Sequence, residues 1–313
     1  MIILHTMNED YGKSVPPRKA PMSNLPAAGF VAISLLIVFF TYQIIGAVFT
    51  IAVTGTKAEI SFSNLNTMRL LITFSQYMLL LMPAVILNML RGETFKDGFK
   101  IKKPNINITL LGLAGIIIVQ PFLQFFVIIQ NKILFSLPLG QDIINQLKEV
   151  FELLEGTTIK LVTAYSVPEF IVVVFVIAVT PAICEEFLFR GLILRTFEKS
   201  YPPMNAVIFT GIIFALFHFH PFNLIPLIVL GFFLSYIAHF SGSIYPAILI
   251  HFVNNFISAL AVYLFGEEVL DDSVIGNSEL LWYGITALIS LALFLLIIFN
   301  IKKIYNKSKG EYA

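Results

Sequence analysis

The sequence is poor in charge and in cysteine, and each shortage excludes a class of protein. Only 12% of the 313 residues are charged and 58% are hydrophobic, whereas a soluble domain is about 25% charged and about 45–50% apolar. The two departures together indicate a polytopic membrane protein. The single cysteine, Cys184, excludes an internal disulfide framework and a cysteine-rich metal site. The net charge of +1 argues against nucleic acid as a partner.

The N-terminal region lacks a cleavable signal peptide in the usual place, because the first apolar run begins only near Ala27. Residues 1–26 are polar and contain proline. We therefore expect them to form a poorly ordered cytoplasmic tail.

Long apolar runs fill most of the remaining chain. A membrane-spanning helix needs about 20 mostly apolar residues. The sequence predicts an all-α polytopic membrane fold with eight such helices, at residues 27–53, 67–90, 106–136, 166–199, 204–220, 222–240, 244–265 and 280–301.

Basic residues are distributed unevenly between the loops, which predicts an orientation. Fifteen of the 20 lysines and arginines fall on one side if both termini are cytoplasmic, while the acidic loop 266–273 falls on the other. Because cytoplasmic loops carry the excess of Lys and Arg, both termini are predicted to be cytoplasmic. The Ile-, Phe-, Lys- and Asn-rich composition indicates a low-GC bacterium, so the predicted location is a bacterial cell membrane.

Several ionisable and amide side chains nevertheless fall inside the predicted spans. Such a charge costs about 2.5–3.5 kcal/mol on insertion scales, so it normally faces the protein interior and marks a site. In the fourth to seventh helices these residues are Glu185, Glu186, Arg190, His218, His220, His239, His251, Asn254 and Asn255. His220 and His239 lie at span boundaries and are interpreted as interfacial.

Glu185 and Glu186 are adjacent but require different partners. Glu186 and Arg190 are four residues apart on one helical face, and the simplest interpretation is a buried ion pair. Glu185 points about 100° away from Glu186. Pro181 precedes Glu185 by four residues; it either opens room for water beside this carboxylate or is one of the prolines common in membrane helices.

Helix geometry suggests the partners of Glu185. Glu185 lies 16 residues before Tyr201 and His218 lies 16 residues after Pro202, so an antiparallel hairpin places both at one depth. His251 and Asn255 are one turn apart on the seventh predicted helix. All four site residues converge if the fourth, fifth and seventh helices are neighbours.

A carboxylate with two imidazoles in an apolar cavity is suited to activating water. The glutamate accepts a proton, and a histidine holds the water directly or through a metal such as zinc. A second histidine with an asparagine can donate hydrogen bonds to an oxyanion. Together these groups make an amide hydrolase, although the H-E-x-x-H motif of soluble zinc proteases is absent.

Three motifs in order resemble those of the CPBP intramembrane proteases, the Abi or CAAX-protease group. They are E-E-x-x-x-R followed by Gly191, then F-x-x-x-H ending at His218, then H-x-x-x-N ending at Asn255. The group includes the CAAX endopeptidases and bacteriocin-processing or immunity proteins. One departure is the segment GIIFALFH, which is bulkier than the small-residue run common in the family. The predicted division is a tail at 1–26, membrane helices with loops at 27–165, a catalytic core at 166–265, and a final loop, helix and basic tail at 266–313.

The resemblance implies a role for each matching residue. Glu185 is the implied general base, His218 holds water or a metal, and His251 with Asn255 stabilises the oxyanion. The implied supporting residues are Glu186, Arg190 and Phe214. If zinc is used, its implied ligands are Glu185, His218 and His251; a metal-free mechanism through glutamate and histidine remains equally open.

The predicted function is therefore an intramembrane endopeptidase acting on a membrane-associated protein or peptide. Prenylated substrates are not expected in a bacterium. One alternative is a non-catalytic scaffold or immunity protein of the same fold, against which the intact motifs count. The other is a proton-coupled transporter using Glu185 and the histidines, although no paired halves are visible. The substrate and the oligomeric state remain open.

Overall fold

The computed structural model describes residues 20–55, 65–136, 158–220, 223–266 and 277–310, together with Gly140, Asn145, Gln146 and Gly156. All regular elements in this part of the chain are helices, which confirms the predicted all-α fold. The predicted tail 1–26 is described only from Ala20, and the acidic loop 266–273 only at Gly266.

Within the described residues, seven helical stretches are long and apolar enough to cross a membrane. They are Ala27–Thr54, Leu65–Arg91, Ile106–Ile133, Val167–Glu198, Leu224–Ser241, Tyr245–Phe265 and Glu279–Lys309. The remaining predicted span is α11 (Pro203–Phe217), which has only 15 residues. At 1.5 Å per residue it is about 22 Å long, less than the roughly 30 Å of a hydrocarbon core. The fifth predicted span, residues 204–220, is thus a short apolar helix that ends just before His218.

Three of the spans contain π-helical turns, labelled η. The first consists of α1 (Ala27–Val38), η1 (Phe39–Ile45) and α2 (Gly46–Thr54). The second consists of α3 (Leu65–Ser75), η3 (Gln76–Leu81) and α4 (Met82–Arg91). The fourth consists of α8 (Val167–Val174), η4 (Phe175–Val179), α9 (Thr180–Glu186), η5 (Phe187–Ile193) and α10 (Leu194–Glu198). Such wide turns are frequent at functional sites, and here two of them flank the glutamate pair.

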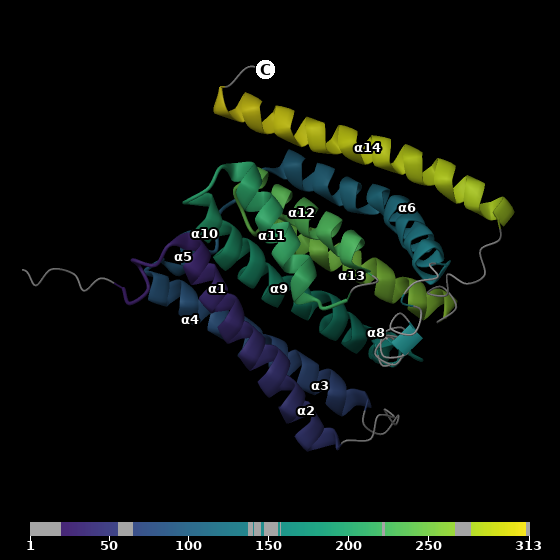
Figure 1. Ribbon diagram of the computed structural model, residues 1–313, viewed down its shortest axis with the longest axis horizontal. Helices are drawn as coiled ribbons and strands as arrows, with labels where there is room; N and C mark the ends of the chain where they lie inside the picture. Colours follow the sequence, from purple (N-terminus) through teal and green to yellow (C-terminus); the bar gives the residue numbers. More distant parts are fainter. Residues whose placement is uncertain are drawn as a thin grey trace, which may run out of the picture.

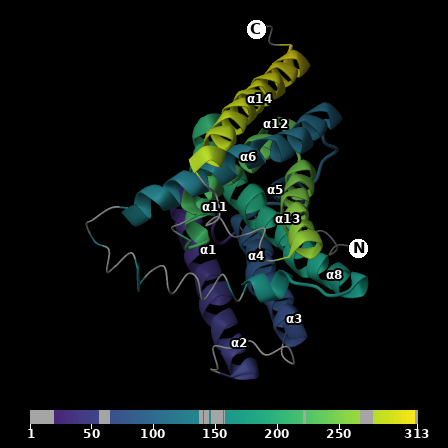
Figure 2. The same cartoon turned by 90° about the vertical axis from the view of Figure 1, so that its right-hand side faces the viewer.

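The other helices are more uniform. They are α5 (Phe95–Gly98), α6 (Ile106–Ser136), α12 (Leu224–Ser241), α13 (Tyr245–Phe265) and α14 (Asn277–Lys309). Figure 1 shows α14 lying along α6 at one edge and the hairpin of α1–α2 with α3–α4 at the opposite edge. The helices from α8 to α13 lie between these two layers (Figures 1 and 2). The helices that carry the predicted site are therefore covered on both sides.

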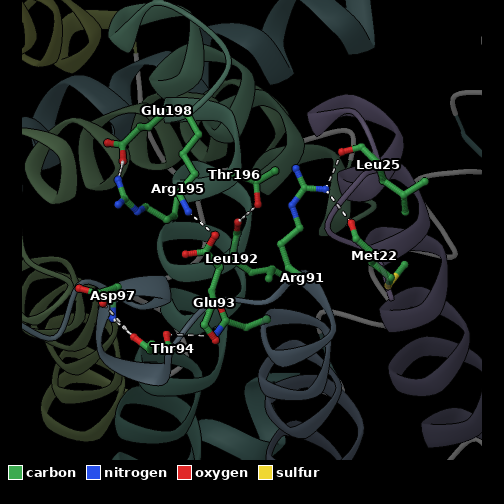
Figure 3. Close-up of polar contacts among 12 residues, drawn as sticks. Met22, Leu25, Arg91, Glu93, Thr94, Asp97, Leu192, Arg195, Thr196 and Glu198 are labelled. Carbon is green, nitrogen blue, oxygen red and sulfur yellow. Dashed lines mark hydrogen bonds and ion pairs between the residues drawn. The ribbon is translucent and has the colours of Figure 1, made fainter. Parts of the chain in front are cut away.

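Two of the basic residues predicted to share one side, Arg91 and Lys199, lie near each other in the described part of the chain. Arg91, at the end of α4, donates hydrogen bonds to the carbonyls of Met22 and Leu25 (Figure 3). Lys199 pairs with Glu93 beside them. Arg91 thus attaches the segment before α1 to α4, and the Lys199–Glu93 pair attaches the residue after α10 to the residues that follow α4. The membrane side that this end faces stays a prediction.

A buried arginine ties the helices together at the start of α8. Arg69 is only 1% exposed and its guanidinium lies 2.8 Å from the Glu169 carboxylate. It also donates to the carbonyls of Leu161 and Thr163. The second oxygen of Glu169 accepts from the backbone N–H of Tyr165. Every charge in this cluster has a partner, so we assign it a structural role.

Candidate active site

Glu186 forms the buried ion pair that the sequence predicts. A terminal nitrogen of Arg190 donates to Glu186 Oε1 at 2.6 Å, and both side chains are fully buried. The other terminal nitrogen donates to the carbonyl of Gly231 on α12 at 3.0 Å. The pair therefore fixes the rotation of the fourth span and attaches it to α12.

His251 also contacts the Glu186 carboxylate, for which the sequence predicted Arg190 as the partner. Its Nδ1 lies 2.8 Å from Glu186 Oε1. A carboxylate can only accept, so Nδ1 carries the hydrogen and Nε2 can donate only if the ring is doubly protonated. Glu186 thus joins α9 to α13, and its contact with His251 orients the imidazole.

Glu185 faces His218, as the hairpin geometry predicts. Glu185 Oε2 lies 3.7 Å from His218 Nε2. His218 Nδ1 lies 2.7 Å from the carbonyl of Phe214, which can only accept, so Nδ1 carries the hydrogen in the neutral ring. Nε2 then presents its lone pair to the carboxylate, and two acceptors face each other. Unlike Glu186, these side chains are partly accessible, at 16% for Glu185 and 29% for His218.

The ring of Phe214 packs among the charged and imidazole groups. Its centroid lies 4.5 Å from the guanidinium carbon of Arg190, 4.6 Å from the ring of His218 and 6.1 Å from the ring of His251. Arginine over an aromatic face is a favourable cation–π contact. The ring of Phe214 thus lies among three of the predicted site groups, and its supporting role stays a prediction.

Comparison with known proteins adds a family to this geometry. Residues 167–257 match the family model described as Type II CAAX prenyl endopeptidase Rce1-like. Over these residues the chain is similar to the CAAX protease family. The family is one of proteases, so the match supports a protease activity for this integral membrane protein. No curated protein and no solved structure matched the chain.

The glycine of the CAAX-protease motif has a clear packing reason. A Cβ placed on Gly191 would lie 2.3 Å from Cδ1 of Phe99, which is fully buried. Phe99 also packs against Phe187 at a centroid distance of 4.8 Å. The absence of a side chain at position 191 lets the segment after α5 lie against η5.

A small pocket lies beside this glycine, at the basic end of the matched segment. It is lined by Asn88, Arg91, Glu93, Gly191, Leu192, Arg195, Thr196 and Lys199. Figure 3 shows Arg195 directed to Glu198, at 3.9 Å, and the Thr196 hydroxyl to the carbonyl of Leu192. The pocket is therefore separate from the pair of acceptors at Glu185 and His218.

Asn255 takes part in a chain of amides that sequence reasoning did not find. Its Nδ2 donates to the carbonyl of Ile177 in η4 at 3.1 Å, and its Oδ1 accepts from Asn254 at 3.1 Å. Asn254 in turn accepts from Gln120 on α6 at 3.0 Å. Gln120 lies outside the matched segment. The sequence signal for Gln120 is an amide inside an apolar run, on a helix that precedes the three motifs.

Two polar residues in the first two spans, Tyr42 and Gln76, also lie outside the matched segment. Tyr42 on η1 lies near Glu185, and Gln76 on η3 lies near Tyr42. Gln76 is only 7% exposed. The N-terminal hairpin thus brings a phenol and an amide to the side of the family segment that carries Glu185.

The three predicted zinc ligands are divided between two contacts. Glu185 and His218 face each other, whereas His251 is engaged by Glu186. Across the described ranges, no three His, Cys, Asp or Glu side chains come together as metal ligands. The donor set therefore does not fit a zinc ion, and the reaction proposed below uses only groups of the chain and water.

Proposed function

We propose that this protein is an intramembrane endopeptidase that hydrolyses a peptide bond of a membrane-associated protein or peptide. The observation that carries the proposal is the pair of facing acceptors, Glu185 Oε2 and His218 Nε2, 3.7 Å apart within the protease-family segment. Arg190 and Glu186 support the pair by fixing the rotation of its helix.

The spacing of the two acceptors suits a water molecule. A direct hydrogen bond would need a donor and a distance of about 2.7–3.2 Å, and this pair has neither. A water can donate one hydrogen to the carboxylate and the other to the imidazole. Its oxygen lone pairs then remain available for attack on a carbonyl carbon.

The proposed reaction balances with these groups alone. As the water oxygen bonds to the scissile carbonyl carbon, Glu185 takes one of its protons and the carbonyl oxygen becomes an oxyanion. Asn255, and His251 in its doubly protonated form, donate hydrogen bonds to that oxyanion. When the tetrahedral intermediate collapses, the C–N bond breaks and Glu185 returns the proton to the leaving amine.

The family suggests which substrates to test first. Its description names prenyl endopeptidases that act at a CAAX sequence, whereas the composition points to a bacterium. Suitable probes are an internally quenched farnesylated peptide ending in a CAAX sequence and the same peptide without the lipid. If neither is cleaved, labelling of new N-termini in the membrane fraction identifies substrates without a prior choice.

The decisive variant is Glu185→Gln, assayed as purified protein in lipid micelles. Glutamine keeps the shape of the side chain but cannot accept the proton, so we expect cleavage to fall by about 10²–10⁴-fold. The matched control is Glu279→Gln, in the first turn of α14, which should cleave like the unmodified protein. Cleavage by Glu185→Gln at the unmodified rate would overturn the proposed role of Glu185. No cleavage by the unmodified protein, together with capture of a partner that survives Glu185→Gln, would favour a non-catalytic scaffold.

The zinc hypothesis has its own test. Elemental analysis of the purified protein, with His218→Ala as the comparison, measures bound metal directly. A stoichiometric zinc ion that is lost in His218→Ala would replace the metal-free reaction with a metal-assisted one. We expect no metal that depends on His218.

A further inference from the structure

A hydrogen-bonded chain of three amides crosses the membrane core from α6 to η4. Gln120 Nε2 donates to the carbonyl of Ile116 at 2.9 Å and to Asn254 Oδ1 at 3.0 Å. Asn254 Nδ2 donates to Asn255 Oδ1 at 3.1 Å. Asn255 Nδ2 donates to the carbonyl of Ile177, also at 3.1 Å.

The direction of this chain is fixed at both ends. The carbonyls of Ile116 and Ile177 can only accept, so a nitrogen of Gln120 and a nitrogen of Asn255 must face them. Both N–H groups of Gln120 are then used, one for each acceptor. Reversing Asn255 alone would place its oxygen against the Ile177 carbonyl and its nitrogen against the nitrogen of Asn254. The three amides therefore hold one arrangement together.

Pro181 explains why the Ile177 carbonyl serves as the last acceptor. A residue in an α-helix normally bonds the carbonyl four residues earlier, but proline has no N–H to donate. The carbonyl four residues before Pro181 belongs to Ile177, and the side chain of Asn255 bonds it. The proline thus provides a point of attachment for α13, a role beyond the two considered from sequence.

We propose that Gln120 is a positioning residue that sets the orientation of the Asn255 amide. The inference rests on the proposed function, in which Asn255 donates to the oxyanion. With one N–H of Asn255 engaged by Ile177 and its oxygen engaged by Asn254, the second N–H remains to be offered to the reacting carbonyl. Gln120 therefore influences the reaction from a helix outside the matched family segment, without touching the substrate.

The kinetic test replaces Gln120 by methionine, which has a similar length but no donor. We expect kcat to fall by roughly three- to tenfold, the equivalent of one hydrogen bond between membrane helices, with KM unchanged. The matched control is Ser290→Ala, since Ser290 donates to the carbonyl of Ile118 on the same helix at 2.5 Å. This control should lose a similar interhelical bond without losing kcat.

A double substitution separates positioning from general destabilisation. If Gln120 acts through Asn255, Gln120→Met should reduce kcat no further in an Asn255→Ala background. An equal loss in both backgrounds, or an unmodified rate for Gln120→Met alone, overturns the inference. Either result leaves the proposed function intact, because that function is decided by Glu185→Gln.

A second readout does not depend on cleavage. In protein labelled with ¹⁵N-asparagine, the side-chain amide signals of Asn255 are identified by their loss in Asn255→Ala. They should shift in Gln120→Met and stay in place in Ser290→Ala. Unchanged Asn255 signals in a folded Gln120→Met protein would contradict the inference even if no substrate had been found.

Discussion

Two buried clusters in this protein share one pattern, a glutamate with a basic residue and a histidine, but differ in depth. In the core, Glu186 accepts from Arg190 at 2.6 Å and from His251 Nδ1 at 2.8 Å. At the basic end, Glu198 lies 2.6 Å from Lys100 Nζ and 2.7 Å from His239 Nδ1. Each cluster is a carboxylate held by one cation and one imidazole.

Their surroundings differ, and the difference indicates which cluster belongs to a site. The core cluster is inaccessible and uses arginine, whose planar donor set also reaches the Gly231 carbonyl. The peripheral cluster is slightly exposed, uses lysine, and has Arg195 at 3.9 Å as a further cation. Of the two clusters, only the core cluster adjoins a facing pair of acceptors. That pair consists of Glu185, the residue next to Glu186, and His218. A Glu–cation–His cluster is therefore not by itself a sign of catalysis; its neighbours decide.

The largest effect is expected from breaking the core cluster with Arg190→Met. Removing the guanidinium leaves the Glu186 carboxylate buried with one imidazole, and losing one partner of a buried pair costs about 3–5 kcal/mol. Thermal unfolding in detergent should therefore shift strongly to lower temperature. Arg195→Met, at the partly exposed peripheral cluster, should cost less than about 1 kcal/mol. Equal shifts would mean that depth does not distinguish the clusters.

The next largest effect is expected from displacing the Gly231 carbonyl, which accepts a hydrogen bond from Arg190 in the core cluster. Gly231 lies where α12 meets α11 most closely, and a Cβ there would be 2.6 Å from the carbonyl oxygen of Gly211. Gly231→Ala should separate the helices and displace the acceptor of Arg190, at a cost of about 1–3 kcal/mol. Gly29→Ala, whose Cβ would meet only the Pro26 side chain at 3.4 Å, is the control for thermal unfolding. If the two variants unfold alike, this close approach does not support the core cluster.

Much of this arrangement was predictable from the sequence because local rules govern it. The spans follow from apolar length, and the Glu186–Arg190 pair follows from a spacing of four residues on a helix. That Glu185 and His218 lie at the same depth follows from the equal rise per residue on the two arms of a helical hairpin. Each prediction needs only helix geometry and the cost of burying charge.

The remaining features depend on contacts between helices distant in sequence. Which residue contacts His251 depends on the rotation of α13 about its axis relative to α9. The spacing of residues along a single helix does not predict that rotation. Gln120 and Tyr42 become relevant only because α6 and η1 pack beside the family segment. The shortness of α11 reflects the turn at His218, which follows a run of apolar residues that looks continuous.

A smaller effect is expected at the peripheral cluster from His239→Leu. The substitution removes one charged hydrogen bond from Glu198 but leaves Lys100 in place, so we expect a loss of about 1–2 kcal/mol in the free energy of unfolding. Cleavage per folded molecule should not change, whereas His251→Leu should reduce it. A loss of cleavage in His239→Leu comparable to that in His251→Leu would show that the two clusters are functionally equivalent.

The smallest effect is a pH dependence confined to the peripheral cluster. Burial lowers the pKa of Lys100 below its ordinary value of 10.5, and the nearby Glu198 only partly opposes this shift. Between the lowered pKa and 10.5, the unfolded chain binds more protons at this residue than the folded protein. The contribution of Lys100 to the free energy of unfolding therefore rises with pH across that window and is constant below it.

Thermal unfolding measured at increasing pH up to about 10.5 should show the unmodified protein gaining stability relative to Lys100→Met, by less than about 1.4 kcal/mol per pH unit. Parallel curves would mean that Lys100 titrates as in the unfolded chain, and that the peripheral cluster carries no penalty for its buried charge.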